Sequence, residues 1–288
     1  QIGTPQEVFD HPANLFVAGF IGMPRMNMFD GKLIKKDGKY AVELGGYVVE
    51  VSEEKQAALE DALAANDKVI VLPEGEYTFP AGQIKAGTTI VCEEGTVFTG
   101  NSKANINGAT IVGATFSNPD GSAVDQTING TFRDCTFTGV NGLRWCYAGN
   151  TCVFENCVFE GSLYGAHFDG GANPITFKNC VFSGFNAFAG ATPLVTFEGC
   201  TFKSNPNNAT YNGANLWGSA KMVNCEFTFD GSTTYEWIDC IGTSKEYSFE
   251  NCTINGVAYT PENYSDYLIY IESRNSITAK INGIDCAM

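Results

Sequence analysis

The sequence predicts an all-β protein built mainly as a right-handed parallel β-helix, a solenoid of three sheets. One pattern recurs every 20 to 27 residues between Ile111 and Ile254, and its copies read IVGATF, FRDCTF, FENCVF, FKNCVF, FEGCTF, MVNCEF and FENCTI. Such a repeat is typical of solenoids, in which each copy buries its apolar face only against its neighbours. We expect a right hand from the usual chirality of parallel crossovers.

Each copy combines two strands with a bend. Ile175 and Phe177 alternate with polar residues and share one face, whereas Cys180 and Phe182 alternate one residue out of phase. The bend residue that absorbs this slip is always a type that readily adopts a left-handed backbone: Gly113, Asp134, Asn156, Asn179, Gly199, Asn224 and Asn251. We therefore predict strand, bend and strand, followed by a variable loop and a third strand.

Identical positions of stacked copies should form ladders. Two aromatic ladders are expected, of Phe132, Phe154, Phe177, Phe197, Met222 and Phe249, and of Phe116, Phe137, Phe159, Phe182, Phe202, Phe227 and Ile254. The bend residues give an asparagine ladder, and six of the 11 cysteines give a cysteine ladder. A buried thiol behaves as a small hydrophobe, so we expect reduced cysteines, with a Cys146–Cys152 disulfide as the alternative.

Composition excludes several classes of function. The formal charge of −15 leaves no basic surface for nucleic acid, so no nucleic-acid partner is expected. No apolar run among the 288 residues is long enough to span a membrane. With only two histidines and no zinc-like cysteine spacing, no metal site is predicted.

Residues 1–51 lie outside the repeat and form a separate predicted segment. Thr4-Pro5-Gln6-Glu7 is a helix start, and short strands with turns at Asp30-Gly31, Asp37-Gly38 and Gly45-Gly46 follow. The stretch QIGTPQEVFDHPANLFVAGFIGMPRMNMFDGKL closely resembles the ATP-binding subunit of maltose-type sugar ABC transporters. The phosphate-binding loop and the signature motif of that family are absent, so no catalytic residue carries over. We interpret the segment as a remnant, a fusion or an artefact of sequence assembly.

Residues 52–288 form the predicted solenoid domain. An amphipathic helix is predicted over residues 53–65, and VIVLPEGEYTF then gives two strands around a Pro-Glu-Gly turn. This order resembles the start of pectate-lyase-like β-helix proteins. The resemblance implies that the helix plugs the open end of the solenoid, and that a substrate groove follows the sheet lying about 12 residues before each repeat cysteine.

The strands of that sheet supply the candidate site residues. We expect Leu143, Trp145, Ala166, Phe168, Ile238 and Cys240 to point inward. Arg144, His167 and Asp239 should then point outward, with Asp169 at the strand end, as candidates for binding or cleaving an acidic sugar. Tyr147, Asn215, Trp217 and Trp237 are candidates for carbohydrate binding. The calcium-binding aspartates of pectate lyases and the Gly-His-Gly motif of polygalacturonases are missing; calcium is kept as the sole cofactor alternative.

We therefore predict a non-catalytic recognition module that binds a polysaccharide or cell-surface glycan, of the bacterial-surface or phage-tail type. The first alternative is a polysaccharide lyase or hydrolase. The second is an ABC transporter ATP-binding fragment, on the strength of residues 1–51 alone. The first two fit an extracellular or virion-associated location, and the third a cytoplasmic one. No sequence feature indicates an oligomeric state.

Overall fold

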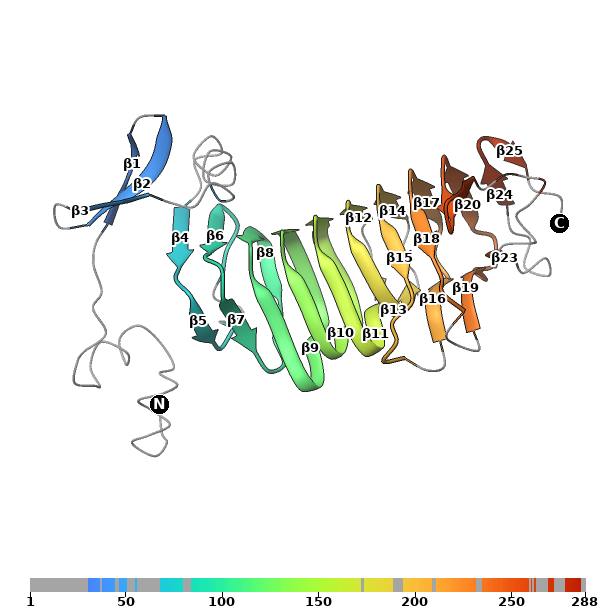
Figure 1. The fold of residues 1–288 in the computed structure, drawn as a ribbon, viewed down its shortest axis with the longest axis horizontal. Coiled ribbons are helices and arrows are strands. Elements are labelled where there is room, and N and C mark those ends of the chain that lie inside the picture. Colours follow the sequence, from blue (N-terminus) through green and yellow to red (C-terminus); the bar gives the residue numbers. More distant parts are fainter. Residues whose placement is uncertain are drawn as a thin grey trace.

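The computed structural model is all-β in nearly every part that it describes. The described residues are 31–36, 38–44, 47–50, 55, 68–79, 84–171, 174–188, 194–208, 211–231, 235–258, 260, 262, 269–271 and 278–285. A small sheet precedes a long parallel solenoid whose turns run from β4 to β25 (Figure 1). The predicted fold class is confirmed as a parallel β-solenoid. The helix start at Thr4 and most of the helix predicted over 53–65 lie outside the described residues.

The small sheet is antiparallel and consists of β1 (Gly31–Lys36), β2 (Lys39–Leu44) and β3 (Tyr47–Glu50). Tyr40 and Val42 pack with Val69 against the buried Val91 of the solenoid. Lys55 is helical and buried, and its Nζ occupies the space that a Cβ on Gly113 would need. The first bend residue, Gly113, therefore has no room for a side chain, because Lys55 lies against it.

Two of the three solenoid sheets come directly before and after the bends. The first sheet contains β4 (Lys68–Leu72), β6 (Thr88–Cys92), β8 (Asn105–Val112), the ends of β9 (Thr115–Arg133) and β10 (Thr136–Glu155), β12 (Ile175–Lys178), β14 (Val195–Glu198), β17 (Ala220–Val223), β20 (Glu246–Glu250) and β24 (Thr278–Ile281). The second contains β5 (Gly75–Tyr77), β7 (Thr96–Thr99), the beginnings of β9, β10, β11 (Val158–Gly171) and β13 (Val181–Phe188), then β15 (Thr201–Lys203), β18 (Glu226–Thr228) and β21 (Thr253–Ile254). Each turn pairs in parallel with the turns beside it.

The third sheet is the one predicted to carry the site. It contains the middle parts of β9 and β10 and the second halves of β11 and β13, followed by β16 (Tyr211–Leu216), β19 (Tyr235–Cys240) and β23 (Ile269–Ile271). Its register is irregular in β10, where the pairing shifts between Arg144 and Tyr147. Its outer face is therefore less uniform than that of the first two sheets.

The bends have the backbone that the repeat predicts. All seven predicted bend residues have positive φ, from 51° at Asn179 to 76° at Gly113. The amide of Asn156 donates to Asp134 Oδ1 at 3.1 Å, and the amide of Asn179 donates to Asn156 Oδ1 at 3.4 Å. The expected asparagine ladder thus exists where amides follow one another. It stops at Gly199, where a Cβ would lie 2.5 Å from Asn179 Oδ1.

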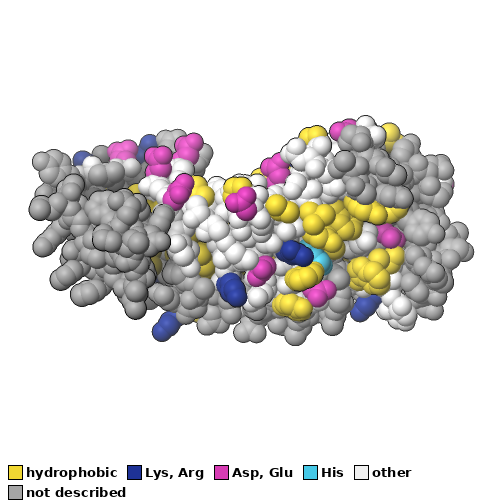
Figure 2. All heavy atoms as spheres, turned by 90° about the horizontal axis from the view of Figure 1, so that it is seen from below, with side chains coloured by type: hydrophobic (Ala, Val, Ile, Leu, Met, Phe, Trp, Pro, Cys, Tyr) yellow, Lys and Arg dark blue, Asp and Glu magenta, His cyan; other side chains and the backbone are white. Residues whose placement is uncertain are grey.

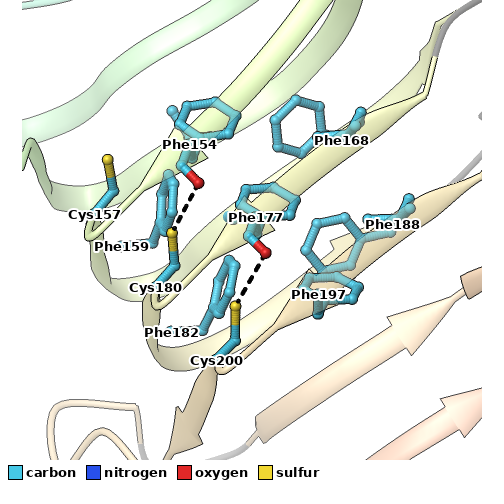
Figure 3. Close-up of a cluster of buried hydrophobic side chains, with 14 of the residues drawn as sticks. Phe154, Cys157, Phe159, Phe168, Phe177, Cys180, Phe182, Phe188, Phe197 and Cys200 are labelled. Atoms are coloured by element: carbon cyan, nitrogen blue, oxygen red, sulfur yellow. Dashed lines mark hydrogen bonds between the residues drawn. The ribbon is translucent and has the colours of Figure 1, made fainter. Parts of the chain in front are cut away.

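Stacked aromatic rings fill the core (Figure 3). Phe154 and Phe177 stack with ring centroids 4.9 Å apart and planes 9° apart, and Phe137 and Phe159 stack at 5.1 Å and 3°. Rings of the two ladders meet edge to face, as Phe177 and Phe182 do at 5.1 Å and 76°. Both arrangements are favourable for aromatic pairs, so each turn adds packing energy against the next.

The ten described cysteines are buried and form no disulfide, Cys146 and Cys152 among them. The alternative of a disulfide between these two is therefore wrong. The cysteines of the repeat form the expected column, and their side chains point toward the core. Burial raises the pKa of the Cys92 thiol to about 12, and burial also raises the pKa of Cys157. The Cys92 and Cys157 thiols are consequently protonated at neutral pH and can act as donors.

Buried asparagines fix the corner between the second and third sheets. The Asn186 amide donates to the carbonyls of Gly184 at 3.1 Å and Gly213 at 3.0 Å, and its Oδ1 accepts from the Ala166 amide at 2.9 Å. One side chain thereby links three successive strands of the third sheet. Asn205 reaches back two turns and donates to the Gly161 carbonyl at 2.9 Å.

The last turns end in two antiparallel hairpins, in which β21 pairs with β22 (Val257–Ala258) and β24 with β25 (Ile284–Asp285). No helix within the described ranges is long and apolar enough to cross a membrane.

Candidate functional site

The outer face of the third sheet carries the predicted site residues, with one correction. Leu143, Ala166, Phe168, Ile238 and Cys240 are buried in the core as expected. Trp145 does not point inward: its backbone φ is +47°, and its side chain is 54% exposed. Cys146 is fully buried in its place. The shift in strand pairing after Arg144 turns the tryptophan outward, so the inward prediction for Trp145 was wrong.

Arg144 lies between two turns that carry carboxylates. It is in register with Asp125 on the preceding turn, and its guanidinium lies 4.3 Å from the centre of the Trp145 ring. Asp125 Oδ2 accepts from the Asn101 amide at 2.8 Å. No salt bridge to Arg144 occurs among the described residues. The guanidinium is therefore held by the aromatic ring beside it.

His167 lies on the following turn, close to Arg144. Its ring stacks on Tyr164 with centroids 4.7 Å apart, and its side chain is only 8% exposed. Burial lowers the pKa of His167 below 6.5; the nearby Asp169 opposes this shift and Arg144 reinforces it. The imidazole is therefore neutral at pH 7.

Tyr147 and Asp169 close this cluster toward solvent. The Tyr147 hydroxyl donates to Asp169 Oδ2 at 3.1 Å, and this hydrogen bond raises the pKa of the tyrosine. Both side chains are exposed. We call Asp125, Arg144, His167, Asp169 and Tyr147 the polar cluster.

A hollow of about 220 Å³ lies further along the same face. It is lined by Phe185, Tyr211, Asn215 and Trp237, three aromatic rings and one amide. Gly213 lies in register between Phe185 and Trp237 and has no side chain to fill the interval between them. Phe185 and Tyr211 pack with centroids 5.6 Å apart. We call these four lining residues the aromatic hollow.

An aromatic row connects the hollow to the polar cluster. Tyr164 is in register with Phe185, and their ring centroids are 5.4 Å apart. Figure 2 views this side of the molecule, and hydrophobic side chains gather there around a histidine and a basic side chain. The two sites therefore form one continuous face along the solenoid axis.

Several polar atoms on this face are buried without a hydrogen-bond partner among the described residues. They include Arg144 Nε, His167 Nδ1, Asp125 Oδ1 and Asn215 Oδ1. A buried polar group without a partner costs free energy, and such groups in a protein often mark a binding or catalytic site. The structure thus concentrates unsatisfied hydrogen-bonding capacity on the predicted face.

The structure divides the predicted site residues into groups. Arg144, His167, Asp169 and Tyr147 belong to the polar cluster, and Asn215 and Trp237 to the aromatic hollow. Asp239 lies one turn after Asn215 and is in register with it. Trp217 follows the end of β16, is 48% exposed and is not among the residues that line the hollow.

Four contributors were missed by the sequence analysis: Asp125, Tyr164, Phe185 and Tyr211. Tyr211 could have been found, because it alternates with Asn215 through Gly213 and so shares its face. The others depend on the register between turns, which loop lengths obscure. Within the described ranges no group of three or more His, Cys, Asp or Glu side chains is arranged to hold a metal ion.

Fold and face together define a parallel β-solenoid with an aromatic and polar outer surface. No family model and no solved structure matches the chain. Curated proteins match short parts of it. The multiple sugar-binding transport ATP-binding protein MsmK of Streptococcus mutans is 60% identical over 43 residues, covering 13% of this chain and 11% of its own length.

Two further relatives have similar descriptions. The oligosaccharides import ATP-binding protein MsmX of Bacillus subtilis is 46% identical over 61 residues, 21% of this chain and 16% of its own. The sn-glycerol-3-phosphate import ATP-binding protein UgpC of Jannaschia sp. is 36% identical over 95 residues, 33% of this chain and 25% of its own. The chain therefore spans a quarter or less of these relatives.

Proposed function

We propose that this chain is a non-catalytic recognition module that binds a glycan along the outer face of the third sheet. The aromatic hollow carries the proposal. Sugar rings present apolar C–H faces that stack on aromatic side chains, and their hydroxyls need fixed polar partners such as an amide. Three aromatic rings around Asn215 supply both.

The repeat of the solenoid supports a chain-like ligand. Parallel strands bring corresponding residues of successive turns about 4.8 Å apart, so one face offers similar contacts at regular intervals. Solenoids commonly use such extended surfaces for binding. A cell-surface or bacterial polysaccharide, itself a repeating polymer, suits this surface better than a small compact ligand does.

Binding to a polysaccharide panel tests this function. Trp237→Ala removes a wall of the aromatic hollow and should weaken binding of any hit at least about tenfold, the loss of one stacking contact. Ile284→Ala is the control, because Ile284 is 57% exposed on β25 at the far end of the chain. The proposal fails if no polysaccharide binds, or if both variants bind like the parent.

A polysaccharide lyase or hydrolase is the second candidate, favoured by the polar cluster. A neutral imidazole is a competent base at pH 7, and Arg144 lies close enough to His167 to influence its titration. Cleavage would appear as new double-bond absorbance or as new reducing ends. Either signal should vanish in both Arg144→Ala and His167→Ala; a signal that persists in both would exclude this site.

The matches to ATP-binding proteins favour a third candidate, a fragment of a sugar-import ATPase. The chain has no GxxxxGK[ST] loop to hold phosphates. Titration of the whole chain with a fluorescent ATP analogue tests this candidate. Saturable binding that ATP displaces would support a nucleotide-binding role, and absence of binding would exclude that role for this chain.

A further inference from the structure

We propose that the ligand of this face is an uncharged, polyhydroxylated glycan, and that it extends from the aromatic hollow to the polar cluster. This inference rests on the proposed function. It replaces the acidic sugar expected from the sequence with a neutral one. The charges and the unsatisfied hydrogen-bonding atoms of the face carry the argument.

The balance of charge opposes an anionic ligand. Arg144 is the basic side chain of the polar cluster. Asp125 on the preceding turn and Asp169 on the following turn are both negatively charged. His167 adds no charge at pH 7, because burial lowers its pKa.

Beyond the polar cluster, Lys103 lies near Asp125 through its hydrogen bond of 3.1 Å to Gln126 Oε1, and the described lining of the aromatic hollow adds no positive charge. The hollow itself contains only neutral side chains, and Asp239 adds a further negative charge beside it. With a formal charge of −15 on the whole chain, a carboxylated polymer would approach a negative surface.

The unsatisfied atoms match a ligand that both donates and accepts hydrogen bonds. Arg144 Nε is a donor, whereas Asp125 Oδ1 and Asn215 Oδ1 are acceptors. The carboxylate or sulfate group of an acidic glycan only accepts, so it can pair with Arg144 Nε but not with the two oxygens. A hydroxyl group does both. The atoms are closed to solvent, so hydroxyls reach them when the surface side chains above them rotate.

The backbone at Trp145 is suited to such a movement. A bulky residue with a φ of +47° is strained, and the exposed indole lies against the guanidinium of Arg144. Rotation of this pair breaks the favourable cation–π contact, a cost that the bound sugar offsets, and uncovers donors for that sugar. The same aromatic ring can then stack on the apolar side of that sugar.

The test compares neutral polysaccharides with their carboxymethylated derivatives, which keep the backbone and add negative charge. Affinity electrophoresis and titration calorimetry are performed at about 20 mM and about 300 mM salt, which span weak and strong screening. We expect neutral hits whose affinity changes less than about twofold with salt. The derivatives should bind at least about tenfold more weakly at low salt, with partial recovery at high salt.

Asp169→Asn sharpens the comparison, because it removes one negative charge and keeps the shape. It should narrow the ratio of the affinities for neutral and carboxymethylated ligands by about threefold. Tighter, salt-sensitive binding of the carboxymethylated polymers overturns the inference.

The two proposals fail differently. If charged polymers bind best and Trp237→Ala abolishes their binding, the neutral-ligand inference fails and the glycan-binding function stands. If no polymer of either kind binds, or if Trp237→Ala leaves binding intact, the glycan-binding function of this face fails as well.

Discussion

The Sγ atom of Cys180 lies 3.5 Å from the carbonyl oxygen of Phe154, one turn earlier in the solenoid. The same contact joins Cys200 to Phe177 at 3.5 Å (Figure 3) and Cys225 to Phe197 at 3.5 Å. The thiol column therefore does more than fill space. Each thiol also lies near the carbonyl two residues before it, as Cys180 does to Lys178 at 3.3 Å, so its single proton is shared between that carbonyl and the one of the previous turn.

Replacing Cys180 should separate the packing contribution from the hydrogen bond. Cys180→Ala removes the donor and leaves a small cavity, so the free energy of unfolding should fall by about 1–3 kcal/mol. Cys180→Ser keeps a donor within reach of the Phe154 carbonyl and should lose less. Equilibrium unfolding in guanidinium chloride measures both. A serine variant less stable than the alanine variant would contradict a role for the hydrogen bond.

The buried thiols should be chemically silent in the folded chain. All ten described cysteines are buried and outside any disulfide, and Cys92, Cys152 and Cys157, whose pKa values burial raises, are not thiolates at neutral pH. A disulfide-exchange reagent should label them slowly in buffer and fully after denaturation without reductant. Fast labelling of Cys157 in the folded chain, located by mass spectrometry, would contradict the core position of the column.

The bends should depend on residues that tolerate positive φ. Asn179 has a φ of 51°, and its amide donates to Asn156. Asn179→Ala should cost about 2 kcal/mol, because alanine pays for the left-handed backbone and loses the hydrogen bond. Asn179→Gly loses only the hydrogen bond and should cost about half as much. Equal stability of the alanine variant and the parent, by thermal and denaturant unfolding, would refute this.

His167 should make stability depend on pH in the mildly acidic range. Its pKa in the folded chain is below 6.5, its value when unfolded, so the unfolded chain binds more protons between the two values. Stability should therefore fall as the pH drops below about 6.5 and stop falling once the folded form also protonates. The groups around this imidazole are Arg144, Asp169 and Tyr164.

His167→Gln should remove this part of the pH dependence. The slope of unfolding free energy against pH between about 5 and 6.5 should be smaller in the variant, because glutamine does not titrate. His11 is present in both proteins and cancels from the comparison. An unchanged slope would mean that His167 is not protected from water by the stack on Tyr164.

The repeat made the fold predictable, because the bend residue and the inward-pointing residues can be recognised within each copy. The bend at Asn179 and the stacking of Phe154 on Phe177 follow from spacing alone. The division into residues 1–51 and 52–288 stays a prediction, as do the roles of the site residues. Local alternation, by contrast, failed at Trp145. A strand that shifts register reverses its faces from that point on, and no residue type in GLRWCY announces the shift.

The aromatic hollow was only partly predictable for a related reason. Asn215 and Trp237 come from different turns, and the loop between them sets whether they meet. Gly213, which keeps the hollow open, looks in the sequence like an ordinary turn glycine. Its φ of 103° and its position beneath the Trp237 backbone become visible only when turns are stacked.

Because every turn pairs only with its immediate neighbours, the number of turns sets the length of the solenoid. Deleting one whole period, such as β12 together with β13, would rejoin two equivalent edges and shorten the outer face by a single rung. Duplicating it would lengthen the face by the same step. The length of polymer that the outer face contacts can therefore be changed one turn at a time, without redesigning either end of the solenoid.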